Sequence, residues 1–129
     1  MSELLIIFSL WPPAEASPNA REHWAPRKRA VDEWKLVART DIHSQLARNT
    51  PLPLKPPVGA SVTVIIPKAK WRRMDQDNFM ARLKPLWDLL REEGIIVDDR
   101  QAALKVYAPV FVRSDQATSP GLVVAMSGQ

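Results

Sequence analysis

The 129-residue chain contains no cysteine. Disulfides and thiolate metal sites are therefore excluded, and any bound metal must use oxygen or imidazole ligands. With only two histidines, the chain has few candidates for a mechanism that activates a serine through a histidine. No apolar run approaches the roughly 18 residues of a membrane span, and an acid stands in the opening stretch where a signal peptide needs positive charge. These absences predict a cytoplasmic protein without a membrane-inserted part.

The net charge of +4 is unevenly distributed. Residues 1–74 carry 12 basic and 6 acidic side chains, whereas residues 75–129 carry 6 basic and 8 acidic ones. A basic half beside an acidic half suits an anionic polymer as partner, with the acids reserved for a metal. The length predicts a single domain over residues 1–129.

Apolar patterning predicts strands and two long helices. Residues 3–10 read as a central strand and residues 60–67 as a second, β-branched strand. Residues 104–112 and 122–126 are expected to pair as a hairpin. One helix is expected over residues 26–49. The fold class is therefore α/β (α+β), a small mixed β-sheet of about four strands with two main helices.

The second helix is expected over residues 77–93, with Gly94 as its C-cap. Pro85 lies inside this segment, where it removes one backbone hydrogen bond and should kink or interrupt the helix. The segment 68–78 that precedes the helix is expected to be a loop.

Two acidic clusters stand about twenty residues apart: Asp75, Asp77 and Asn78, then Asp98 and Asp99. Carboxylates repel one another, and a divalent cation is the commonest reason for them to gather. Oxygen ligands favour a hard ion, Mg²⁺ or Mn²⁺, over zinc. The alternative is that Asp77 or Asn78 caps a helix and that Asp98 and Asp99 form a solvated turn.

Basic residues precede the first acidic cluster and open the first helix. Such cations could bind phosphates, and a tryptophan among them could stack on a base, although a plain solvated surface is the alternative. The candidates for DNA binding are Lys68, Lys70, Trp71, Arg72 and Arg73, with Arg27, Lys28 and Arg29.

The motifs DQDN, KPLWD and VDDRQ, in this order, resemble those of RusA-type Holliday-junction resolvases, the crossover junction endodeoxyribonucleases. The segment SPNAREHWAPRKRA is also similar to phage-borne members of that family, and the resemblance spans residues 10–101. The resemblance implies a Mg²⁺-dependent homodimer that resolves four-way DNA junctions by paired symmetric nicks. A homodimer suits such a substrate, because the junction itself has near two-fold symmetry.

The resemblance also implies roles for single residues. Asp75, Asp77 and Asp99 match the catalytic carboxylates and metal ligands, with Asp98 as a further ligand. The family's lysine would fall at Ala81, so an insertion of three residues moves the role to Lys84, with Arg82 as the rival charge stabiliser. Two functional alternatives remain, a non-catalytic junction- or DNA-binding homologue and a metal-dependent phosphohydrolase of another substrate.

Overall fold

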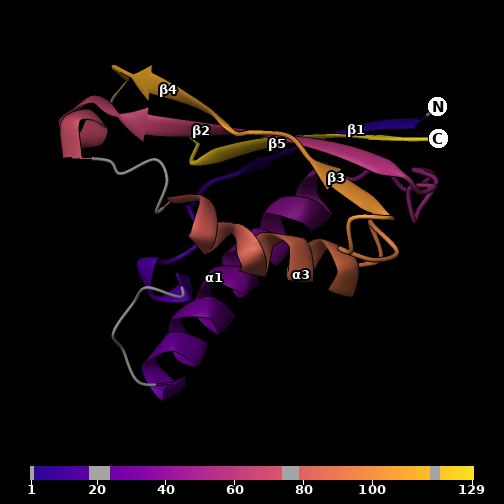
Figure 1. The fold of residues 1–129 in the computed structure, drawn as a ribbon, viewed down its shortest axis with the longest axis horizontal. Coiled ribbons are helices and arrows are strands. Elements are labelled where there is room, and N and C mark those ends of the chain that lie inside the picture. Colours follow the sequence, from indigo (N-terminus) through magenta and orange to yellow (C-terminus); the bar gives the residue numbers. More distant parts are fainter. Residues whose placement is uncertain (1, 18–23, 74–78, 117–119) are drawn as a thin grey trace.

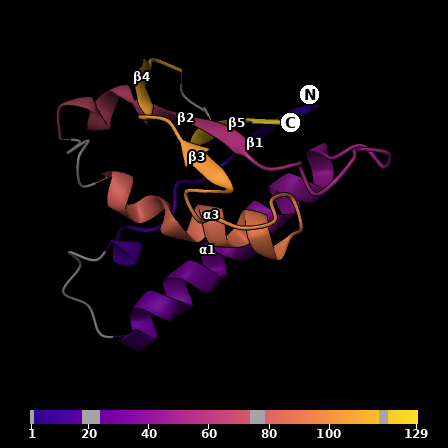
Figure 2. The same ribbon diagram turned by 45° about the vertical axis from the view of Figure 1, so that its right-hand side comes forward.

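The computed structural model describes residues 2–17, 24–73, 79–116 and 120–129. A five-stranded mixed sheet forms one layer, and two helices, α1 (Trp24–Gln45) and α3 (Lys84–Glu92), lie on one of its faces (Figures 1 and 2). The strands are β1 (Ser2–Phe8), β2 (Val58–Pro67), β3 (Leu104–Val106), β4 (Val110–Ser114) and β5 (Leu122–Gly128). The predicted α/β (α+β) class with two main helices is confirmed, and the sheet has five strands rather than about four. No helix in the described ranges is long and apolar enough to cross a membrane.

The first strand lies at the edge of the sheet, so its predicted central position is wrong. The strand order is β1-β5-β2-β3, and β4 also pairs with β2. One face of β1 supplies Ile6 and Phe8 to the core, while Leu5 and Ile7 are exposed on the other. The side-chain amide of Gln45 satisfies the outward backbone of Ile7, accepting at 2.7 Å and donating at 2.6 Å. A nearly continuous apolar run therefore proved compatible with an edge strand.

The predicted hairpin between residues 104–112 and 122–126 is also wrong. Both β3 and β4 pair with β2 in parallel, whereas β5 lies between β1 and β2 and is antiparallel to each. Ten residues long, β2 can pair along one side with β5 and along the other with two short strands in succession. The connection through α3 is long enough to return the chain in the parallel direction. Pro109 separates the two short strands at that edge, as expected for a residue that cannot donate to a ladder.

The core lies between the sheet and the two helices. Alternate residues of β2 are buried, and they face apolar side chains from both helices. In α1 these are Trp34, Ala38 and Ile42, one helical turn apart, and in α3 they include Leu86, Leu89 and Leu90. This packing fixes the position of α3 against the sheet.

The helix α3 begins at Lys84, later than predicted. A 3₁₀ turn, η3 (Ala81–Leu83), precedes it, and Pro85 stands in its first turn. Proline fits that position because the first amide groups of a helix have no intrahelical partner. Pro85 therefore stands at the start of α3 and not inside a longer helix, and the break in the predicted helix falls at η3, just before it. Residues expected as a loop form a further 3₁₀ helix, η2 (Lys68–Arg73), and another, η1 (Ala14–Ala16), follows β1.

Gly94 ends α3 as predicted, with a positive φ of 72°. The Ile95 N–H donates to the Leu90 carbonyl (2.9 Å) and the Gly94 N–H to the Arg91 carbonyl (3.1 Å), the two bonds of a Schellman motif. We expect Gly94→Ala to lower the free energy of unfolding by about 1 kcal/mol, because a Cβ is strained in this region. Urea unfolding measures the loss. Gly94→Asn should lose less, since asparagine tolerates the left-handed region, and an equal loss in both variants would contradict this account.

Candidate active site

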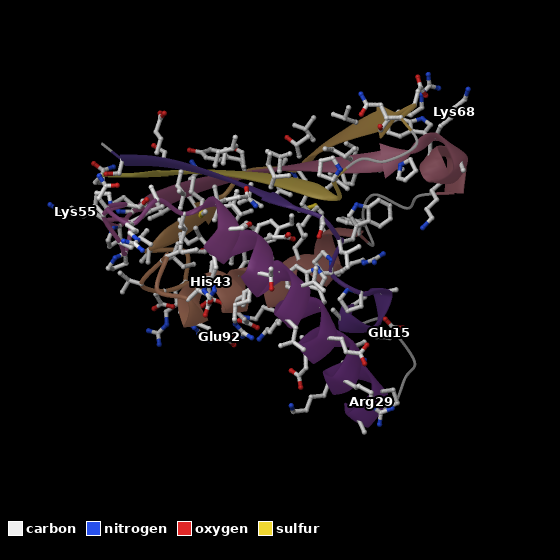
Figure 3. The ribbon with its side chains drawn as sticks, turned by 180° about the vertical axis from the view of Figure 1, so that it is seen from behind. Glu15, Arg29, His43, Lys55, Lys68 and Glu92 are labelled. Atoms are coloured by element: carbon white, nitrogen blue, oxygen red, sulfur yellow. The ribbon has the colours of Figure 1, made fainter. Side chains whose placement is uncertain are left out.

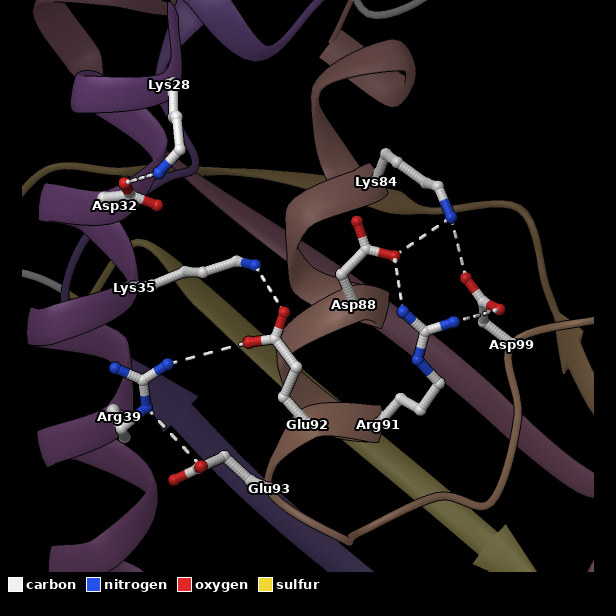
Figure 4. A network of polar contacts seen from close by, with 10 residues as sticks. All are labelled: Lys28, Asp32, Lys35, Arg39, Lys84, Asp88, Arg91, Glu92, Glu93 and Asp99. Atoms are coloured by element: carbon white, nitrogen blue, oxygen red, sulfur yellow. Dashed lines mark hydrogen bonds and ion pairs between the residues drawn. The ribbon is translucent and has the colours of Figure 1, made fainter.

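Four charged side chains meet where α3 faces the chain segment that follows it. Lys84, Asp88 and Arg91 are spaced four and three residues apart and line one face of α3. Lys84 Nζ lies 2.8 Å from Asp99 Oδ2 and 3.0 Å from Asp88 Oδ1 (Figure 4). The Arg91 guanidinium lies 3.6 Å from Asp99 Oδ1 and 3.9 Å from Asp88 Oδ1. Two cations and two carboxylates thus form an alternating cluster, here called the Lys84–Asp99 cluster.

The cluster holds both ionised partners in their charged forms. The hydrogen bond from Lys84 lowers the pKa of Asp99, and the hydrogen bonds to Asp99 and then Asp88 raise the pKa of Lys84. The Asp99 side chain is 14% exposed and that of Lys84 is 65% exposed. The ammonium therefore reaches from solvent into a more protected carboxylate, a position from which it can also meet a bound anion.

Asp98 turns to a different partner than its neighbour Asp99. Its Oδ2 lies 3.3 Å from Nε of Arg100, and its Oδ1 accepts a hydrogen bond from the Arg100 N–H at 3.3 Å. Asp75 and Asp77, the other predicted ligands, lie outside the described residues, as does Asn78. Within the described residues, no three carboxylate or imidazole groups are placed to hold one metal ion.

Asp88 and Arg91 were not among the predicted site residues. Asp88 stands in the KPLWD motif, but nothing in the sequence assigned it a partner. In the structure it contacts Lys84, which also contacts Asp99. The signal was available in the spacing of residues 84, 88 and 91, which repeats one helical face. The contact of Arg91 with Asp99, and the link of Asp88 to Asp99 through Lys84, depend on the turn at Gly94, whose direction the sequence does not specify.

Arg82, the rival to Lys84, is engaged away from this cluster. Its Nε and Nη2 both donate to the carbonyl oxygen of Pro12, at 3.0 and 2.6 Å. The guanidinium also lies 4.9 Å from the ring centre of Phe79 and 5.8 Å from that of Trp11. Burial lowers the pKa of Arg82, and the nearby charge of Glu15 partly offsets this. These contacts connect the segment after β1 to the start of the α3 region.

The basic segment before the first acidic cluster forms η2, at the end of β2. Lys68 and Lys70 are exposed, and Lys70 Nζ lies 5.5 Å from the Trp11 ring centre. Figure 3 shows Lys68 at one end of the molecule and Lys55 at the other. Trp71, the predicted base-stacking residue, is partly buried against the core. The side chains of Arg72 and Arg73 lie outside the described part of the structure.

The basic start of α1 is partly neutralised by its own helix. Lys28 pairs with Asp32 at 2.6 Å, while Arg29 is exposed near the helix end that lies farthest from the sheet (Figure 3). Arg27, the third predicted cation, is half-buried. Other cations of α1 face α3, where Lys35 lies 2.8 Å from Glu92 (Figure 4). Of the predicted α1 cations, Arg29 is therefore the one with the freest approach to a phosphate backbone.

We expect Lys84→Met to lower the free energy of unfolding by less than about 1 kcal/mol at neutral pH, because exposed ion pairs contribute little. Asp99 has a lowered pKa, so its contribution is present above its ordinary value of 3.8 and is lost as the pH falls through its folded-state value. Lys84 has a raised pKa, so its contribution is lost only as the pH rises beyond 10.5. Urea unfolding should show a constant difference between these limits that vanishes in acid. A difference that persists in acid would contradict this origin.

No protein-family model matches the chain, and no curated protein matches it. The geometry of the described residues and the motifs of the sequence therefore carry the functional argument.

Proposed function

We propose that the chain is a Mg²⁺-dependent endodeoxyribonuclease that resolves four-way DNA junctions by paired nicks, acting as a homodimer. The observation that carries the proposal is the contact of Lys84 with both Asp88 and Asp99, at 3.0 and 2.8 Å. It joins the KPLWD motif to the VDDRQ motif, which are separate in the sequence and which this function requires to share one site.

The described carboxylates suit a hard cation. The ammonium of Lys84 stands within 3.0 Å of oxygens from two carboxylates, so these groups can share one positive charge. Of these two carboxylates, Asp99 would hold Mg²⁺, or Mn²⁺ in its place. Asp98 would have to turn from Arg100 to join it, and Asp75 and Asp77 would be the further ligands. The bound ion supplies Lewis acidity, which lowers the pKa of water and stabilises a leaving oxygen.

The protein's own cations complete the proposed chemistry. Lys84, largely exposed, can turn from the carboxylates to the phosphate and balance the charge that develops on it. When Lys84 turns to the phosphate, Arg91 would keep Asp99 in place, because it contacts the other oxygen of the Asp99 carboxylate. Lys68 and Lys70 on η2 would hold the DNA backbone.

One assay tests the proposal against its alternatives. The purified chain is incubated with Mg²⁺ and either a synthetic four-way junction or a linear duplex of the same sequence. Paired nicks at symmetric positions in the junction alone are the expected result. Junction binding without nicks, in Mg²⁺ or Mn²⁺, would instead favour a non-catalytic binding protein. Activity on small phosphate esters without a preference for the junction would favour a phosphohydrolase of another substrate.

The role of η2 is tested by the salt dependence of junction binding. We expect Lys68→Ala to reduce the slope of log affinity against log salt by about 1, because each lost phosphate contact releases about one counterion fewer. Lys55→Ala is the matched control, an exposed lysine at the opposite end of the molecule (Figure 3). Fluorescence anisotropy over a salt series measures both. Equal slopes for the two variants would remove η2 from the proposed interface.

A further inference from the structure

Both helices, α1 and α3, lie on one face of the sheet, and no helix of the described residues covers the opposite face, here called the open face (Figure 1). Paired residues of neighbouring strands point to the same side, so the register identifies the side chains of this open face. Exposed apolar side chains stand on it in both edge regions, among them Leu5 (56% exposed) and Val110 (58%). A sheet face that meets water ordinarily carries polar residues at these positions. Exposed apolar surface of this kind marks an interaction site.

The exposed apolar members of the open face are Leu5, Ile7, Tyr107, Val110 and Val112. Tyr107 belongs to this face because its ring lies over Gly59, where an added Cβ would meet the ring at 3.2 Å. The register places Ile7, Val123, Thr63 and Val110 in one row across the sheet. The two ends of this row are therefore both apolar.

Another row of the same face, two rows from that of Ile7, carries one charge of each sign at its ends. The register sets Glu3 opposite Ser127, Ser127 opposite Gly59, and Gly59 opposite Lys105. Three strand spacings, about 14 Å, separate the two ends, so Glu3 and Lys105 of one chain are too far apart to pair. Small residues occupy the middle of the row, and a hollow of about 650 Å³ lies over them. A row with opposite charges at its ends is complementary to its own reversed copy.

We propose that this open face is the interface with a second copy of the chain. A two-fold axis parallel to the strands reverses each row against itself. Glu3 then faces Lys105 of the partner subunit, and Ile7 faces Val110 of the partner subunit. Such a contact is isologous, and two sheets packed face to face with aligned strands are a common arrangement. A second copy of the chain is the partner whose charges match both ends of this row, Glu3 and Lys105, at the same time.

This interface rests on the homodimer of the proposed function and identifies its contact surface. Its test requires neither DNA nor metal. Sedimentation equilibrium of the full chain should give a dimer. Glu3→Lys and Lys105→Glu should each weaken it by at least about tenfold, because each places like charges opposite one another twice. The double exchange Glu3→Lys/Lys105→Glu should restore the affinity. Val110→Glu, exposed in the single chain and therefore compatible with folding, should give a monomer.

The matched control is Leu36→Glu, at an apolar residue on α1 whose exposed fraction (63%) is similar to that of Val110 (58%). It should leave the dimer intact. A chain that is monomeric at every accessible concentration, single charge variants that dimerise like the wild type, or a double exchange without rescue would each overturn the interface. A dimer lost in Leu36→Glu but kept in Val110→Glu would do the same. A chain that dimerises through this face and leaves junctions uncut would refute the proposed function alone.

Discussion

Asp99→Asn should reduce nicking of a four-way junction by roughly 10³-fold, the scale of losing a group that acts directly in a hydrolytic step. Asp99 is the described carboxylate on which the site depends, because it accepts from Lys84 and contacts Arg91 through its two oxygens. The amide keeps the shape and loses the charge that would hold a metal. Junction binding should be unchanged or tighter, since one negative charge near the phosphates is gone. Single-turnover nicking in Mg²⁺ and anisotropy without metal measure the two effects separately.

Glu33→Gln is the control for this variant, an exposed carboxylate on α1. It should nick at the wild-type rate. Both variants should unfold within about 1 kcal/mol of the wild type, because the pairs lost at Asp99 are near the surface. An Asp99→Asn protein that nicks at the wild-type rate would leave the Lys84–Asp99 cluster a structural ion pair. Loss of binding together with nicking would place Asp99 in the DNA interface instead.

The strand β2 and the helix α1 were predictable from the sequence, but the pairing of the strands was not. Alternation in residues 58–67 and helical spacing in α1 reflect burial directly, so both elements follow from local pattern. The edge position of β1 does not, because the open face of the sheet is apolar and gives an edge strand the pattern of a central one. The parallel pairing of β3 and β4 depends on the path through α3 and Gly94, a long-range feature that no local pattern contains.

The residues of the candidate site were likewise predictable in part, but their contacts were not. Lys84 and Asp99 were named from motifs, and their 2.8 Å contact depends on the turn after α3. The spacing from Lys84 to Asp88 and Asp99 favoured Lys84, but it left Arg82, two residues earlier, as a rival. The 3₁₀ turn before Lys84 settles their directions, since it turns Arg82 toward Pro12 while Lys84 begins the regular helix. Leu83 and Pro85, on either side of Lys84, are both buried, and this packing is a property of the folded chain that residue spacing does not contain.

Arg82→Met should lower the free energy of unfolding by about 2 kcal/mol, a shift of roughly 30-fold in the folding equilibrium. The guanidinium donates two hydrogen bonds to the Pro12 carbonyl and lies over the Phe79 ring. Charged hydrogen bonds and a partly desolvated cation–π contact together could contribute about 3 kcal/mol. The desolvation that lowers the pKa of Arg82 offsets part of this. Urea unfolding of the variant measures the remainder.

Two further variants decide what kind of contact Arg82 makes. Arg82→Lys keeps the charge but cannot donate in a fork to one oxygen, so it should recover only part of the loss. Arg82 and Lys70 both lie near the Trp11 ring. Lys70→Met removes only the exposed cation, so it should lower the free energy of unfolding by at most about 1 kcal/mol. Once corrected for the folded fraction, Arg82→Met should nick at the wild-type rate while Lys84→Met is slowed. A stable Arg82→Met protein that cannot nick would reverse the two roles, because the guanidinium would then have to leave Pro12 and stabilise charge at the phosphate.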